Sequence, residues 1–229
     1  NSYDCRGVAY WRDPKAAAAN APCAARIFMN TNDRRLFALD AATAQVVGAL
    51  NTSGTRAILL KGPTLARWLY EHPHERPYGD VDLLVAPERF ELAEAALAHC
   101  GFRYQLAGAR PHKQVTHAHH WVRERPVRAA VDLHRSLYWI RLTDAAAWRI
   151  LSRNTDVIDV AGVSVEVLDL PARALVVALH CSQHGLSERR PLRDLSRALA
   201  VADDALWRQA ADLAAQLAVR EPFAAGLTW

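Results

Sequence analysis

The stretch Gly79-Asp-Val-Asp-Leu-Leu-Val85 opens with two aspartates and continues as an apolar strand. In a strand, residues two apart point to the same side, so Asp80 and Asp82 are expected to project together. Neighbouring carboxylates repel each other and need a compensating cation in an apolar strand. Mg²⁺ is usually held by one or two carboxylates together with substrate phosphates. The pair therefore predicts a divalent-metal site; the alternative is a strand end with two acids in solvent.

Two further segments favour the metal site. Val131-Asp-Leu-His134 carries a third acid, Asp132, in another apolar strand. If the two strands are neighbours, Asp132 completes a three-carboxylate site for two metals. Leu59-Leu-Lys-Gly-Pro-Thr64 reads as a strand-to-helix turn where Gly62 admits a phosphate close to the backbone and Lys61 adds positive charge. Read alone, this segment is also an ordinary turn.

Working outward, the pattern alternates strands with helices and ends in a helical region. Asp169 is the expected N-cap of that last region. The order indicates an α+β domain followed by helices. Strands are expected at 56–60, 79–86, 101–107, 115–123, 128–134 and, as a pair turning at 161–162, at 156–168; helices are expected at 43–52 (its end only), 64–70, 87–99, 144–153 and through most of 169–229.

Residues 1–46 differ from the rest of the chain. Strands are expected at 26–30 and 35–39, with turns at 31–34 and 40–43, which makes a β-hairpin. The segments 5–11, 21–29 and 35–43 resemble a blade of the quinoprotein (PQQ-dependent) glucose dehydrogenase propellers. One blade cannot bury its own faces, so we expect a remnant without activity of its own. The alternative is a simple β-rich extension.

The composition bounds the classes of protein that remain. The chain has 229 residues, of which 51% are hydrophobic and 23% charged, as in soluble globular proteins. Its apolar runs are far shorter than the ~20 residues of a membrane span, so we expect no transmembrane helix, and we expect no signal peptide either. A net charge of +4 permits a polyanionic substrate such as a nucleotide without requiring nucleic acid.

The chain ends and the cysteines carry further expectations. The first residue is Asn1 rather than Met, so we expect a fragment or a processed product, and the last helix is expected to be cut short at Trp229. The four cysteines show no regular spacing. Cys100 and Cys181 are expected as buried thiols, whereas Cys5 and Cys23 would pair only in an oxidising compartment. We expect a cytoplasmic protein.

From about residue 46 to the end, the chain resembles the DNA polymerase β-like nucleotidyltransferase superfamily, and in particular its poorly characterised bacterial branch. The segments that carry the resemblance are 59–66, 69–70, 76–85 and 131–134, and more loosely His180 with 192–195. The superfamily has a Gly-Ser pair before its paired aspartates. Here Lys61-Gly-Pro63 stands in that place without the serine. The resemblance is therefore weaker support for triphosphate binding at this turn.

The resemblance implies a fold, a domain plan and a reaction. The fold would be a nucleotidyltransferase-like mixed β-sheet with flanking helices, with a catalytic core at 47–153 and a β-hairpin plus helices at 154–229. An NTP, with ATP the first choice, would transfer its NMP group to an acceptor and release pyrophosphate, with Mg²⁺ or Mn²⁺ as cofactor. The acceptor would be a protein, a peptide, a small molecule or RNA; no membrane partner is expected.

The resemblance also assigns site residues. Asp80, Asp82 and Asp132 would be the catalytic and metal-binding residues. Lys61 and the Gly62 backbone would contact phosphate, and Thr64 would supply a hydroxyl.

Two further residues of the site have open roles. Arg76 is expected either to reach phosphate or to pair with Asp80 or Asp82. His134 shares the strand face of Asp132, and is expected to orient an acid, to contact nucleotide, or simply to hold a structural hydrogen bond.

The remaining polar groups favour structural roles. A zinc cluster of His112, His117, His119 and His120 is the weaker alternative to a polar strand face. His180 and His184, one helical turn apart, favour packing over metal binding. Arg193 and Asp194 are expected to form an ion pair between helices.

Two alternatives to nucleotidyl transfer stay open. One is an inactive nucleotide- or partner-binding module on the same fold. The other is a quinoprotein dehydrogenase fragment, which would explain only residues 1–46.

Overall fold

A computed structural model of the chain describes residues 8–12, 25–29, 39–105, 117–125 and 128–228. Contacts divide the chain into two compact units, Asn1–Ala38 and Leu39–Trp229. Residues 35–38 of a predicted strand, His112, and the cysteines at positions 5 and 23 lie outside the described residues.

In the first unit, two short strands form an antiparallel pair. β1 (Val8–Arg12) pairs with β2 (Ala25–Met29), with Tyr10 opposite Ile27. The strand predicted at 26–30 is therefore present as far as Met29. Its partner is β1, a segment without a predicted strand.

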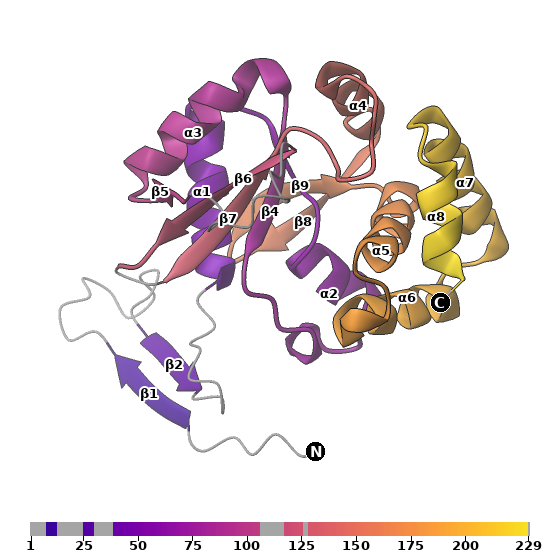
Figure 1. The fold of residues 1–229 in the computed structure, drawn as a ribbon. Coiled ribbons are helices and arrows are strands. Elements are labelled where there is room, and N and C mark those ends of the chain that lie inside the picture. Colours follow the sequence, from indigo (N-terminus) through magenta and orange to yellow (C-terminus); the bar gives the residue numbers. More distant parts are fainter. Residues whose placement is uncertain (1–7, 13–24, 30–38, 106–116, 126–127, 229) are drawn as a thin grey trace. The chain divides into compact units, whose positions relative to one another are not determined.

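The second unit is built on a mixed seven-stranded sheet (Figure 1). The strand order is β5-β6-β7-β4-β3-β9-β8. β4 runs parallel to β7 and β3 parallel to β9, whereas the other neighbours are antiparallel. The α+β prediction is confirmed. The strands are β3 (Ala57–Leu59), β4 (Val81–Val85), β5 (Arg103–Tyr104), β6 (Ala118–Arg123), β7 (Ala129–His134), β8 (Thr155–Val160) and β9 (Val163–Leu168).

Helices cover both faces of this sheet. On one face, α1 and α3 bury Val46, Leu97 and their neighbours against Leu83 and Val131. On the other, α5 packs on the sheet, and α2 and α6 to α8 gather around it (Figure 1). The helices are α1 (Leu39–Thr52), α2 (Pro63–Leu69), α3 (Phe90–His99), α4 (Asp144–Leu151), α5 (Leu170–His184), α6 (Arg189–Val201), α7 (Asp204–Gln216) and α8 (Arg220–Leu227).

Helix boundaries follow local signals, with one correction. Asp169 caps α5 as predicted, because its carboxylate accepts a hydrogen bond from the Ala172 N–H at 3.0 Å. The turn predicted at 40–43 is wrong. These residues form the first turn of α1, where the charge of Asp40 suits the positive end of the helix.

No helix in the described part of the chain combines the length and apolar character that a membrane span requires.

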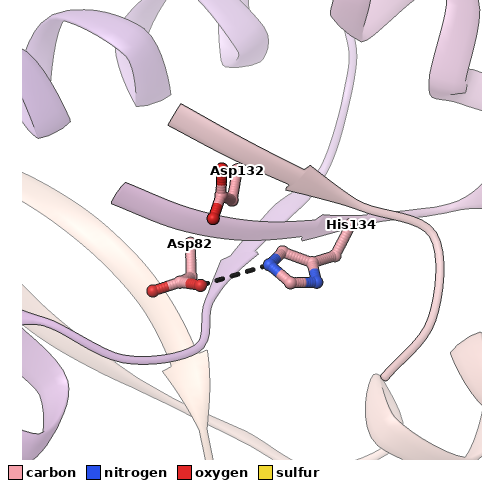
Figure 2. Close-up of side chains that lie close together, drawn as sticks. All are labelled: Asp82, Asp132 and His134. Carbon is pink, nitrogen blue, oxygen red and sulfur yellow. Dashed lines mark hydrogen bonds and ion pairs between the residues drawn. The ribbon is translucent and has the colours of Figure 1, made fainter. Parts of the chain in front are cut away.

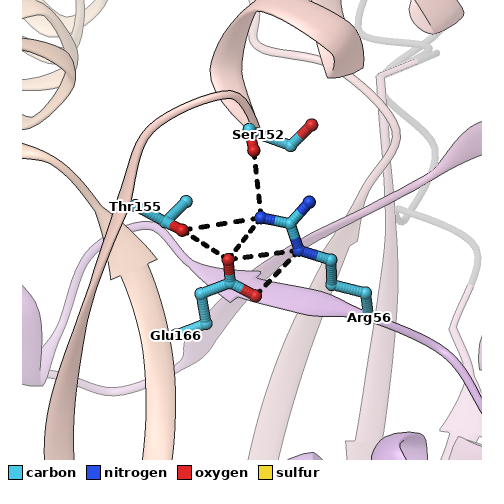
Figure 3. Close-up of polar contacts among 4 residues, drawn as sticks. All are labelled: Arg56, Ser152, Thr155 and Glu166. Atoms are coloured by element: carbon cyan, nitrogen blue, oxygen red, sulfur yellow. Dashed lines mark hydrogen bonds and ion pairs between the residues drawn. The ribbon is translucent and has the colours of Figure 1, made fainter.

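One exposed polar network connects the start of β3 with β9 and β8 at one edge of the sheet (Figure 3). Arg56, before β3, donates to the Glu166 carboxylate on β9 and, at 2.9 Å, to the Ser152 carbonyl after α4. Thr155 on β8 donates to the same carboxylate. Because the Arg56 side chain is 46% exposed, such a pair contributes only about 0.2–1 kcal/mol. The network therefore adds little to stability.

Helices α5 and α8 approach each other at a glycine. A Cβ placed on Gly226 would lie 2.0 Å from the Ala178 carbonyl oxygen, which is backbone and cannot turn away. The glycine therefore allows α8 to pack directly against the backbone of α5.

We expect Gly226→Ala to destabilise the chain by about 3 kcal/mol, since the added methyl forces the two helices apart. The matched control is Gly48→Ala in α1, where no atom lies within 4 Å of an added Cβ. That change should stabilise the chain by about 0.5–1 kcal/mol through helix propensity. Urea unfolding measures both changes, and equal effects would contradict the close packing.

Candidate active site

The register between β4 and β7 places two of the predicted acids side by side. Asp82 pairs with Asp132 across the parallel ladder. Adjacent strands lie about 4.8 Å apart, so in-register side chains share a face. Ligand atoms of Asp82, Asp132 and His134 all lie within 4.8 Å of one another, and Figure 2 shows the three side chains together. The sheet thus brings together acids that are fifty residues apart in the sequence.

Asp82 is the buried member of the pair, with 3% of its surface exposed. Burial alone would raise its pKa. The Lys61 ammonium at 2.9 Å and the His134 Nε2 at 3.2 Å outweigh burial and hold the pKa of Asp82 well below its usual range. Asp82 is therefore ionised, with a lysine cation beside it.

Asp80 lies in the bend directly before β4, two residues from Asp82 and within electrostatic range of Asp82, Lys61 and Asp132. Burial and the charge of Asp82 raise the pKa of Asp80, while Lys61 opposes the rise. Asp80 is not a member of the donor set around Asp132, although the charges of the two carboxylates act on each other.

Asp132 is the accessible member, with 29% of its side chain exposed. The His120 Nδ1 lies 2.5 Å from its Oδ1, and the two residues are direct partners in the β6–β7 ladder. An ionised carboxylate only accepts hydrogen bonds, so Nδ1 is the donor to an ionised Asp132. Each central carboxylate therefore has its own histidine: His134 for Asp82 and His120 for Asp132.

These residues fit a divalent cation with oxygen ligands. Carboxylate oxygens suit Mg²⁺ and Mn²⁺, whereas imidazole suits softer metals. Asp82 and Asp132 are thus the natural ligands, and His134 serves better as the donor that holds Asp82. The second ring nitrogen of His134, Nδ1, is buried without a hydrogen-bond partner among the described residues.

The predicted phosphate turn is present, with its glycine in a conformation that other residues rarely adopt. Gly62 has φ +65°, and the Tyr78 ring lies 3.3 Å from the position of an added Cβ. The helix that follows is short and starts at Pro63, which has no N–H to offer. The Thr64 hydroxyl is buried and donates to the Leu59 carbonyl at 3.4 Å. The Thr64 hydroxyl is thus engaged with the backbone, and the Lys61 ammonium with Asp82.

Arg76 has a partner that the sequence does not indicate. Its guanidinium donates to both oxygens of Asp194 on α6, at 2.6 and 2.9 Å, and the Tyr70 hydroxyl donates to the same carboxylate at 2.7 Å. Arg76 is only 4% exposed. The expected pairing of Arg76 with Asp80 or Asp82 is wrong, because this guanidinium is committed to Asp194.

The predicted pair of Arg193 with Asp194 is wrong for the same reason. Adjacent helical residues point about 100° apart, so Asp194 lies in the interior while Arg193 is exposed. Burial and the bond to Asp194 raise the pKa of Tyr70 to about 12, so the hydroxyl stays a donor.

Further histidines have partners other than the two central carboxylates. His119 faces away from the acids and its Nδ1 lies 2.6 Å from Glu94, whereas His117 contacts the His134 ring at 5.7 Å between centroids. His180 and His184 stack edge to face at 4.7 Å between centroids. Among the described residues, none of the five histidines His117, His119, His120, His180 and His184 belongs to a group of side chains that could hold a metal ion.

Sequence reasoning missed two residues near the acids. The sequence does not indicate that His120 contacts Asp132, because that contact depends on the register between β6 and β7. Arg190, exposed at the start of α6, partly offsets the rise in the pKa of Asp80 through its charge. Only the tertiary structure brings α6 within range.

We expect Lys61→Met to raise the pKa of Asp82, because the nearest cation is removed. The depressed pKa of Asp82 gives stability that is present above its unfolded value of about 3.9 and is lost as pH falls through the folded value. In the variant the loss should begin near the same unfolded value, be smaller in total, and be complete at a higher pH. Carbon NMR of the Asp82 carboxyl measures the shift. The control, Arg67→Met on α2, removes an exposed cation and should leave the Asp82 pKa unchanged; equal behaviour of both variants would contradict the pairing.

We expect Arg76→Met to destabilise the chain by about 3–5 kcal/mol, because it leaves Asp194 buried and unpaired. The double variant with Asp194→Leu should recover most of this loss in urea unfolding. The control Arg193→Met, exposed on the same helix, should change stability by less than about 0.5 kcal/mol. Strictly additive effects of the two buried changes would argue against the ion pair.

Comparison with known proteins gives the family and the fold. The model of a family described as an uncharacterised nucleotidyltransferase matches residues 19–229. No curated protein sequence matches the chain.

Two similar solved structures are both of ANT(2″)-Ia. A solution structure of this antibiotic-resistance factor is 14% identical with a TM-score of 0.56, and the match covers 80% of this chain and 95% of that one. A crystal structure of ANT(2″)-Ia with adenylyl-2″-tobramycin is 12% identical with a TM-score of 0.53, covering 78% and 98%. At these identities the likeness establishes the nucleotidyltransferase-like fold. With the family match over most of its length, the chain belongs to the uncharacterised nucleotidyltransferases and is a nucleotidyltransferase.

Proposed function

We propose that the chain transfers the NMP group of an NTP, with ATP as the first choice, to an acceptor hydroxyl, with Mg²⁺ or Mn²⁺ as cofactor. The observation that carries this proposal is the in-register pair of Asp82 and Asp132, whose ligand atoms lie within 4.8 Å. Two close carboxylates on one sheet face are the protein's share of a site that holds a divalent ion and a triphosphate.

The roles of the residues follow from burial and charge. Asp82, buried and held by His134, is the fixed ligand, and Asp80, whose charge acts on Asp82 and Asp132, is the third metal-binding carboxylate of the proposal. Asp132, more exposed, is the carboxylate that the acceptor reaches, and it takes the hydroxyl proton. Lys61 and the Gly62 backbone bind phosphate. The metal, when bound, supplies neutralisation of the charge on the triphosphate.

The reaction balances without covalent chemistry by the protein. The acceptor oxygen forms a bond to the α-phosphorus, and the bond from that phosphorus to the bridging oxygen of the β-phosphate breaks. Pyrophosphate leaves, and the acceptor proton passes to Asp132. Positioning and charge compensation are the main requirements of such a step.

A hydroxyl-bearing small molecule is the first acceptor class to screen. One similar structure contains adenylyl-2″-tobramycin, a small molecule that carries an adenylyl group. Protein, peptide and RNA ends are the next classes. A cytoplasmic location belongs to the same proposal, because that is where cells keep NTPs.

The domain plan is part of the proposal too. Residues 47–153 would form the catalytic core and 154–229 the supporting hairpin and helices. The family match begins at residue 19 and so includes part of the stretch that resembles a propeller blade. The assignment of 1–46 as an inactive remnant stays a prediction, and PQQ binding by the full chain would contradict it.

With labelled ATP, Mg²⁺ and pooled acceptors, we expect label transfer by the wild-type chain and a loss of at least about 100-fold in Asp82→Asn and in Asp132→Asn. Several kcal/mol of charge stabilisation disappear with either carboxylate, and each 1.36 kcal/mol is a factor of ten. The control Asp204→Asn removes an exposed carboxylate of α7 and should retain transfer. Transfer that is equal in all variants, or absent from the wild type, would refute the proposal. Retained ATP binding without pyrophosphate release would instead identify an inactive module.

A further inference from the structure

His120 is the polar contact beside the acids that the proposed reaction has not used. It lies at the centre of β6, the strand next to β7, and is the direct ladder partner of Asp132. Its Nδ1 is 2.5 Å from Asp132 Oδ1, the shorter of the two histidine–carboxylate contacts in the site. Nothing in the sequence pattern distinguishes it from His119, whose side chain faces the opposite side of the sheet.

The two central carboxylates differ in how firmly their surroundings hold them. Asp82 is buried and contacts both Lys61 and His134. Asp132 is 29% exposed, and His120 is the hydrogen-bond partner that the described residues give its side chain. A half-exposed carboxylate with one donor depends on that donor for its orientation.

We propose that His120 is a positioning residue: its Nδ1–H holds the Asp132 carboxylate in the orientation that binds the metal. This inference rests on the proposed function. Donors that orient ligating groups typically change metal affinity by 10- to 100-fold when they are lost. His134 would play the matching part for Asp82, so each ligand has a histidine from the same sheet.

The strand itself supplies a matched control. His119 is the next residue, on the same strand, and also forms a histidine–carboxylate contact, at 2.6 Å from Glu94. The Arg135 guanidinium contacts its other ring nitrogen at 3.2 Å. Because successive side chains alternate, His119 lies on the face away from Asp132. Replacing it tests whether any histidine lost from β6 has the same effect.

The experiment measures the dissociation constant for Mn²⁺ alone by electron paramagnetic resonance of the full chain at one fixed pH. We expect His120→Ala to weaken Mn²⁺ binding by about 10- to 100-fold. His120→Asn places an amide donor where Nδ1 was and should bring the affinity back near the wild-type value. His120→Gln puts its donor one atom further out and should not. His119→Asn should bind Mn²⁺ as the wild type does.

The outcomes separate this inference from the function on which it rests. Wild-type affinity in His120→Ala, or an equal loss in His120→Asn and His120→Gln, would overturn the positioning role. An equal loss in His119→Asn would overturn it as well. A wild-type chain that binds no Mn²⁺ would overturn the proposed function and this inference together. Mn²⁺ binding that depends on Asp82 but not on His120 would overturn this inference alone.

Discussion

The site depends on the parallel pairing of β4 with β7, which sets one carboxylate directly beside another. Such a pair is unfavourable in an apolar interior, where like charges repel more strongly than in water. The fold offsets the repulsion locally: Lys61 lies against Asp82, His134 donates to Asp82 and His120 to Asp132. A one-residue slip of β7 would turn Asp132 to the opposite face and Leu133 into the site. The apolar residues between the acids, packed under α1 and α3, oppose such a slip.

The loop before β4 connects the acids to the rest of the unit through two structural contacts. Arg76 is bound to Asp194 on α6, and Tyr78 packs over Gly62 and donates its hydroxyl to Asp40 on α1. Burial, with the bond to Asp40, raises the pKa of Tyr78 well above its usual range, so its proton stays available for that bond. The segment 76–82 therefore combines two anchoring residues, Arg76 and Tyr78, with the two aspartates of the proposed site.

Local pattern was enough to predict most elements of the sheet and to single out Asp82 and Asp132, which the structure brings together. Apolar runs and turn residues located β3, β4, β7 and α5, because those signals act within a few residues. The pattern could not supply strand register, which decides that Asp132 lies beside Asp82 and His120 beside Asp132. Nor could it supply the Arg76–Asp194 pair, whose members are 118 residues apart.

The most direct measurement of the central claim is a crystal structure of the chain with Mn²⁺ and a non-hydrolysable ATP analogue, with the metal located by its anomalous scattering. The account predicts a peak within coordination distance of carboxylate oxygens from both Asp82 and Asp132, with the triphosphate on the same face. A peak held by other side chains, or by Asp82 without Asp132, would contradict it.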